Sequence, residues 1–112
     1  MTQRDKVVLR KFLSEIKILE DETSNISYEV FLATETIKRT AAMTLINIGE
    51  LARCLSDEFR KNVTGIPVKQ IIGLRDRIVH GYATIDFEIV WSTIKEDIPV
   101  FKANIENLLE LT

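Results

Sequence analysis

Histidine and cysteine are almost absent from this sequence, which has one of each among 112 residues. The single Cys54 excludes an intramolecular disulfide, and no cysteine–histidine cluster of the kind that holds zinc can form. We therefore expect no metal site and no cofactor. Cys54 is interpreted as a small core residue. The one histidine, His80, is the only imidazole that can exchange a proton near neutral pH.

Long apolar runs are also missing. The longest uncharged stretch is residues 40–49, whereas a membrane-spanning helix needs about 20 apolar residues. The amino-terminal segment has no uninterrupted apolar stretch, because charges stand at Arg4, Asp5 and Lys6, so it does not resemble a signal peptide. We expect a soluble protein that works in the cytoplasm and does not contact a membrane.

Positive charge does not predominate overall, but one segment is basic. The net charge of −2 argues against a general nucleic-acid coat protein, whose binding depends on neutralising phosphates. Residues 60–82, however, carry five basic side chains and one acidic side chain. This segment also contains His80. Chance clustering over a short window is the simple explanation for the local charge.

Helical periodicity dominates the first half of the chain, and strand signals are almost absent. Apolar residues spaced by three and four predict a first helix from Arg4 to about Glu22. Ser27 is a suitable N-cap for a second, long helix from about Tyr28 to Phe59, with a continuous apolar seam. Gly49 lies inside that helix, where it costs about 1 kcal/mol relative to alanine, so we expect it to permit close helix packing.

The second half predicts two further helices. Pro67 suits the first turn of a helix that ends at about His80, followed by Gly81 as its C′ residue. Asp86 is a suitable N-cap for a final helix over residues 87–108, which Pro99 should kink or split. The expected fold is all-α, an antiparallel bundle of four or five helices in a single domain covering residues 1–112.

Arg75 and His80 are the residues best suited to chemistry. Arginine can grip a phosphate with two parallel hydrogen bonds, and a histidine in the last turn lies at the negative end of the helix dipole. Together they suffice for metal-independent RNA cleavage, with histidine moving the proton and arginine stabilising charge on phosphorus.

A five-residue step turns about 140° around a helix, so the side chains of Arg75 and His80 do not share a face. One site would require the helix to end near His80, or a second subunit. From spacing alone, a helix-capping histidine is the commoner case.

Residues 75–82 (RDRIVHGY) resemble the R-x4-H-x-Y signature of the HepT branch of the HEPN superfamily. Further segments resemble other elements of that family: residues 48–52 (IGELA), 65–74 (GIPVKQIIGL), 89–91 (IVW) and 97–99 (DIP). The resemblance covers residues 35–108 and keeps all three positions of the motif.

This resemblance implies a HEPN-like helical toxin of a type II toxin–antitoxin pair. Such ribonucleases cut RNA without metal and leave a cyclic phosphate. Their arginine and histidine, here Arg75 and His80, face those of a second subunit across the cleft of a homodimer. The implied partner is a minimal (MNT-type) nucleotidyltransferase antitoxin, which silences the toxin by transferring AMP to the motif tyrosine, here Tyr82. We expect the Tyr82 hydroxyl at the mouth of the cleft, next to Arg75 and His80.

Neighbouring charged residues supply supporting roles. Glu50 lies on the helix expected to pack against the motif helix and is predicted to hold Arg75. Asp76 either orients Arg75 or His80, or is a solvated helix residue.

Three further basic residues, Arg77, Lys69 and Arg39, are candidate RNA contacts. For Arg77 and Arg39, as for Lys38, an exposed helix face is the alternative interpretation. Trp91 and Phe101 are expected in the core. The alternative function is a non-catalytic helical dimer that binds a nucleotidyltransferase or a nucleotide, with Tyr82 as a regulated contact.

Overall fold

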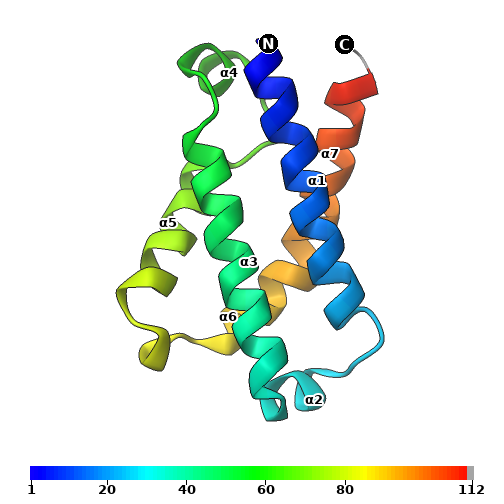
Figure 1. The fold of residues 1–112 in the computed structure, drawn as a ribbon, viewed down its shortest axis with the longest axis vertical. Coiled ribbons are helices and arrows are strands. Elements are labelled where there is room, and N and C mark those ends of the chain that lie inside the picture. Colours follow the sequence, from blue (N-terminus) through cyan, green and yellow to red (C-terminus); the bar gives the residue numbers. More distant parts are fainter. Residues whose placement is uncertain (111–112) are drawn as a thin grey trace.

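The computed structural model of this chain describes residues 1–110. Its helices are α1 (Gln3–Thr23), α2 (Tyr28–Ala33), α3 (Glu35–Arg53), α4 (Asp57–Asn62), α5 (Val68–His80), α6 (Phe87–Ser92) and α7 (Ile98–Glu110), with a 3₁₀ turn η1 (Tyr82–Thr84) and a π-helical segment η2 (Thr93–Asp97). The four longer helices run antiparallel in succession (Figure 1). The predicted all-α bundle is confirmed, and residues 1–110 form no strand. None of the described helices is long and apolar enough to cross a membrane.

The core lies between α1, α3 and α7, and α5 covers the outer side of α3 (Figure 1). Phe12 of α1 meets Phe101 of α7 edge to face, with ring centroids 5.2 Å apart. Phe101 is buried as predicted, whereas Trp91 is half-buried at the edge of the core. In α5 only Ile78 is fully buried. The motif helix therefore packs on α3 with much of its surface open.

The predicted long helix over residues 28–59 is wrong, because the chain breaks it twice. Thr34 takes an extended backbone conformation between α2 and α3. At the second break the Ser56 hydroxyl accepts a hydrogen bond from the Phe59 N–H and so starts α4. The buried Asp5 carboxylate accepts hydrogen bonds from the Ser56 N–H and hydroxyl, which holds this turn in place. Cys54 lies at this break and is exposed, so its predicted place in the core is also wrong.

The last helix is interrupted before Pro99 by a π-helical segment, where a kink or split was predicted. The Asp86 carboxylate caps α6 by accepting from the Glu88 N–H at 3.0 Å. Pro99 is the second residue of α7, and the π-helical η2 comes directly before it. There the Ile98 N–H bonds to the Thr93 carbonyl, five residues back. Such a widened turn accommodates a proline that has no N–H to donate.

Candidate functional site

Gly49 lets Arg75 lie directly against α3. A Cβ atom built on Gly49 would stand 2.2 Å from Cβ of Arg75 and 2.6 Å from its Cγ, closer than real atoms approach. The expectation that Gly49 permits close helix packing is thereby confirmed. Its absent side chain makes the room in which the stem of Arg75 runs across α3 towards Glu50.

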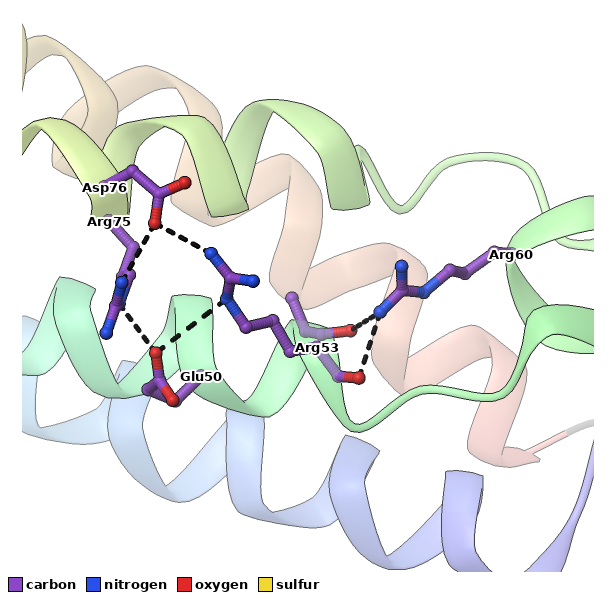
Figure 2. Close-up of polar contacts among 6 residues, drawn as sticks. Glu50, Arg53, Arg60, Arg75 and Asp76 are labelled. Atoms are coloured by element: carbon purple, nitrogen blue, oxygen red, sulfur yellow. Dashed lines mark hydrogen bonds and ion pairs between the residues drawn. The ribbon is translucent and has the colours of Figure 1, made fainter.

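Two carboxylates hold the Arg75 guanidinium (Figure 2). The Glu50 Oε1 atom lies 2.6 Å from Nε, and the Asp76 Oδ1 atom lies 2.9 Å from Nη1. The first contact is an ion pair without hydrogen-bond geometry, whereas Nη1 donates a hydrogen bond to Asp76. Only 26% of the Arg75 side chain is exposed. The two residues predicted to support Arg75 therefore both contact it.

Arg53 joins the same group of charges from the last turn of α3. Its Nη2 atom donates to Asp76 Oδ1 at 2.8 Å, and its Nε atom lies 3.9 Å from Glu50 Oε1 (Figure 2). Hydrogen bonds from Arg75 and then Arg53 lower the pKa of Asp76, which keeps it ionised. We call Glu50, Arg53, Arg75 and Asp76 the Arg75 cluster; it holds two cations and two anions. Sequence reasoning missed Arg53, although its spacing of three from Glu50 on one helix is a readable signal.

His80 faces a different part of the surface. It is exposed in the last turn of α5 and lines a groove between α5 and α6 together with Asp76 and Arg77. Arg75 does not line this groove. Leu74 and Ile89 continue the groove towards α7, where Val100 is exposed. Because α5 stays helical through His80, one protomer does not bring Arg75 and His80 to a common face.

Gly81 ends α5, but not in the predicted way. Its φ of −172° is an extended conformation rather than the left-handed one typical of a C′ glycine. A Cβ atom on Gly81 would stand 2.8 Å from the Thr84 hydroxyl oxygen. That hydroxyl donates a hydrogen bond to the Gly81 carbonyl at 3.0 Å. A side chain at this position would displace the Thr84 hydroxyl, whose hydrogen bond lies across the turn η1.

Tyr82 turns its hydroxyl towards the start of α3. The hydroxyl donates a hydrogen bond to Glu35 Oε1 at 3.0 Å, and the Arg39 guanidinium lies 5.0 Å from the ring centroid. Glu35 also pairs with Lys38 at 3.2 Å and with Arg39 at 3.1 Å. We call Glu35, Lys38, Arg39 and Tyr82 the Tyr82 cluster. Sequence reasoning missed Glu35, because nothing in the sequence links residues 47 positions apart.

The proton of this hydrogen bond belongs to the tyrosine. Burial first, and then the Glu35 carboxylate, raise the pKa of Tyr82. Hydrogen bonds from Tyr82 and Lys38 lower the pKa of Glu35. At neutral pH the pair is therefore a phenol that donates to a carboxylate.

The Tyr82 cluster and the Arg75 cluster lie at opposite ends of α3. Glu35 and Glu50 are 15 residues apart on this helix, which corresponds to about 22 Å. The expected position of the Tyr82 hydroxyl next to Arg75 is therefore wrong within one protomer.

The remaining candidate RNA contacts differ in whether their positive charge is paired within the protein. Arg39 is committed to Glu35 and to the Tyr82 ring. Arg77 and Lys69 are exposed on α5, and within residues 1–110 neither they nor His80 form an ion pair or a side-chain hydrogen bond. Across the same residues, no three histidine, cysteine, aspartate or glutamate side chains gather where they could hold a metal ion.

Comparison with known proteins identifies the family. The family described as "Ribonuclease HepT-like" matches residues 12–108. This chain belongs to the HepT-like ribonuclease family. Its relatives include "Putative RNase MJ1380" of Methanocaldococcus jannaschii, which is 32% identical over 95% of this chain and 98% of its own length. "Putative RNase TTE0752" of Caldanaerobacter subterraneus is 31% identical over 91% of each chain. "Probable ribonuclease HepT" of Thermococcus cleftensis is 30% identical over 96% of this chain and 98% of its own.

Membership agrees with the resemblance of the R-x4-H-x-Y motif, which lies inside the matched residues. No solved structure matches this chain significantly.

Proposed function

We propose that this protein is a metal-independent endoribonuclease that acts as the toxin of a type II toxin–antitoxin pair in the cytoplasm. One observation carries the proposal: two carboxylates hold the motif arginine against α3, while the motif histidine is exposed in a groove. Arg75 stabilises the charge that develops on the attacked phosphorus. His80 takes the proton of the RNA 2′-hydroxyl or returns one to the leaving oxygen. Arg77 and Lys69, exposed on the same helix, contact further phosphates.

The site is completed by a second copy of the chain. Because Arg75 faces α3 and His80 lines the α5–α6 groove, an Arg75–His80 pair forms between subunits. The groove is lined by exposed apolar side chains on two further helices, Ile89 on α6 and Val100 on α7, with exposed fractions of 46% and 62%. Covering them in a two-fold interface removes apolar surface from water. Light scattering at micromolar concentration should give the mass of a dimer; a monomer would contradict this part.

A nucleotidyltransferase antitoxin silences the enzyme by transferring AMP to Tyr82. Tyr82 follows His80 by two residues, so an adduct adds bulk and negative charge beside the end of α5 and repels RNA phosphates there. Glu35, which the Tyr82 hydroxyl contacts, lies about 22 Å from Glu50 along α3. Inhibition within a protomer therefore acts through access to His80 and does not require a pairing of the new phosphate with Arg75.

The second candidate is a non-catalytic dimer that binds a nucleotidyltransferase or a nucleotide. The observation in its favour is that Glu50 and Asp76 already neutralise Arg75. RNA cleavage separates the two candidates. Purified protein should cleave RNA to cyclic-phosphate ends in EDTA, and His80→Ala should lose this activity by about two to four decades. Cleavage that stops in EDTA and returns with a divalent metal would contradict the mechanism. An inactive wild type would leave the binding module as the function.

A further inference from the structure

We propose that Glu35 is the base that accepts the phenolic proton of Tyr82 when AMP is transferred to it. This inference rests on the proposed silencing by a nucleotidyltransferase. It assigns a catalytic residue for the modification to the chain that is modified, because Glu35 touches the reacting oxygen.

In the protein alone, a carboxylate oxygen of Glu35 already contacts the Tyr82 oxygen that would attack ATP. Glu35 Oε1 lies 3.0 Å from the Tyr82 hydroxyl, within the range in which a general base removes a proton directly. Glu35 is held there by Lys38 and Arg39, which lie on the same helix and pair with its two oxygens. Phe87 packs edge to face against the Tyr82 ring at 5.6 Å and limits the directions that the hydroxyl can take.

The transfer balances with ATP as the AMP donor. The Tyr82 oxygen forms a bond to the α-phosphorus, and the bond from that phosphorus to the oxygen bridging to the β-phosphate breaks. Pyrophosphate leaves with the bonding electron pair. The phenolic proton moves to the Glu35 carboxylate and from there to solvent. Without a base, the attacking oxygen would develop positive charge as it bonds to phosphorus.

The charges around the pair suit this role. Hydrogen bonds from Tyr82 and Lys38, and then the charges of Lys38 and Arg39, lower the pKa of Glu35 and keep it ionised. Burial and then Glu35 raise the pKa of Tyr82, so the proton and its acceptor are both in place at neutral pH. The neighbouring α6 faces the cluster through the apolar ring of Phe87, which packs against both Tyr82 and Lys38.

Tyr28, the only other tyrosine of the chain, can be compared with Tyr82. Burial first, and then the charges of Glu88, Asp86 and Glu29 acting through space, raise the pKa of Tyr28. Within the described residues Tyr28 donates no hydrogen bond to a carboxylate. Only Tyr82 therefore has a base in contact.

The cluster also accommodates the product. Lys38 and Arg39 supply two positive charges against the one negative charge of Glu35. The phosphodiester of the adduct adds one negative charge, which brings the group to neutrality. Arg39, already over the Tyr82 ring, is placed to donate hydrogen bonds to that phosphate.

The experiment measures AMP gain by intact-mass spectrometry with ATP and an MNT-type nucleotidyltransferase. Glu35→Gln keeps a hydrogen-bond acceptor but removes the base, so the initial rate should fall by about two to four decades. Glu35→Asp should recover part of it. The matched control is Glu29→Gln, which changes an exposed carboxylate of the neighbouring α2 and should leave the rate within about twofold.

A pH profile separates a base from a structural anchor. The wild-type rate should fall in acid as Glu35 takes up a proton, and this limb should vanish in Glu35→Gln. Thermal melting checks that each variant is folded. A Glu35→Gln rate equal to or above the wild-type rate, with an unchanged profile, would overturn the inference while leaving Tyr82 as acceptor. A wild type that gains no adenylyl mass would overturn both the silencing proposal and this one. RNA cleavage, measured separately, would be untouched by either result.

Discussion

The two polar clusters on α3 are built from similar side chains for different purposes. In the Arg75 cluster, two arginines meet two carboxylates, so the cations are matched and the key side chain is held still. In the Tyr82 cluster, two cations meet one carboxylate, and the hydroxyl is held against that carboxylate. The first arrangement suits a group that must keep its place and charge. The second has one positive charge to spare and suits a group that gains a phosphate.

The comparison also shows how far apart two neighbouring motif positions end up. Arg75 and Tyr82 are seven residues apart in the sequence, yet their side chains contact α3 at positions 15 residues apart. The antiparallel α5 accounts for part of this separation, and the turn at Gly81 for the rest. Cleavage and silencing are therefore expected to depend on separate sets of side chains.

Crossed substitutions should give the largest effects and test that separation. Arg75→Ala should lower RNA cleavage by about two to three decades, because it removes the charge that stabilises the transition state. The rate of AMP gain at Tyr82 should stay within about twofold, since Arg75 lies in the other cluster. Tyr82→Phe should do the reverse, keeping cleavage and losing adenylylation. If Tyr82→Phe abolishes cleavage, or gains AMP as the wild type does, the division between the clusters fails.

The packing of Arg75 against Gly49 can be disturbed without removing the charge of Arg75. Gly49→Ala introduces a Cβ atom 2.2 Å from Cβ of Arg75, so α5 must shift and the protein should lose about 1–3 kcal/mol of stability. Cleavage should fall with it, while Tyr82 adenylylation changes less. Gly73→Ala is the matched control, because nothing lies within 4 Å of its added Cβ atom. In the middle of α5 it should raise stability by about 0.5–1 kcal/mol. Thermal melts and cleavage assays on both variants check this; equal effects would contradict the assigned role of Gly49.

Acid should loosen the Arg75 cluster in a defined direction. The pKa of Asp76 is lowered by Arg75 and Arg53, so its contribution to stability is present above its unfolded pKa of about 3.9. That contribution is lost as pH falls through the lower folded value. Arg53→Ala should move the Asp76 pKa back up towards its ordinary value, as followed by carboxyl NMR. Lys17→Ala, which breaks an exposed pair on α1, should leave it unchanged. An unchanged Asp76 pKa in Arg53→Ala would show that Arg53 does not act on the cluster.

The smallest expected effect is on the ionisation of Tyr82. In a Tyr28→Phe background only Tyr82 absorbs as a phenolate, and its pKa should lie above the ordinary value of 10.0. Adding Glu35→Gln removes the nearby negative charge, which makes the phenolate less costly, so the pKa should fall. Absorbance titration measures both values. A pKa that does not move, or rises, would mean that Glu35 does not contact the hydroxyl in solution.

The sequence was a good guide wherever a local pattern was sufficient. Apolar spacing correctly predicted α1. Ser27 and Asp86 are the N-caps of α2 and α6, as expected. The last helix is interrupted next to Pro99. The apolar residues spaced by three and four over residues 41–59 are buried, as predicted. They do not lie on one continuous helix, because α3 ends at Arg53 and α4 begins at Asp57. Leu55 and Phe59 are both buried beyond the break, so periodicity alone could not reveal it. The break depends on Asp5, 51 residues away, which holds Ser56.

The candidate site divides in the same way. The sequence motif was sufficient to predict Arg75, His80 and Tyr82 as site residues. The expected packing of two helices was sufficient to predict Glu50. The direction of each side chain could not be predicted, because it depends on which helix lies opposite. Arg75 points at α3 only because Gly49 makes room for it, and Tyr82 meets Glu35 only after the chain turns at Gly81.

A mixed dimer tests most directly whether two chains build one ribonuclease site. Arg75→Ala and His80→Ala chains, carrying different tags, are co-expressed and the heterodimer is isolated through both tags. If Arg75 of one subunit works with His80 of the other, one of the two composite sites is intact, and cleavage should return to about half the wild-type rate per dimer. Each homodimeric variant should stay inactive. A heterodimer as inactive as its parents would contradict the account.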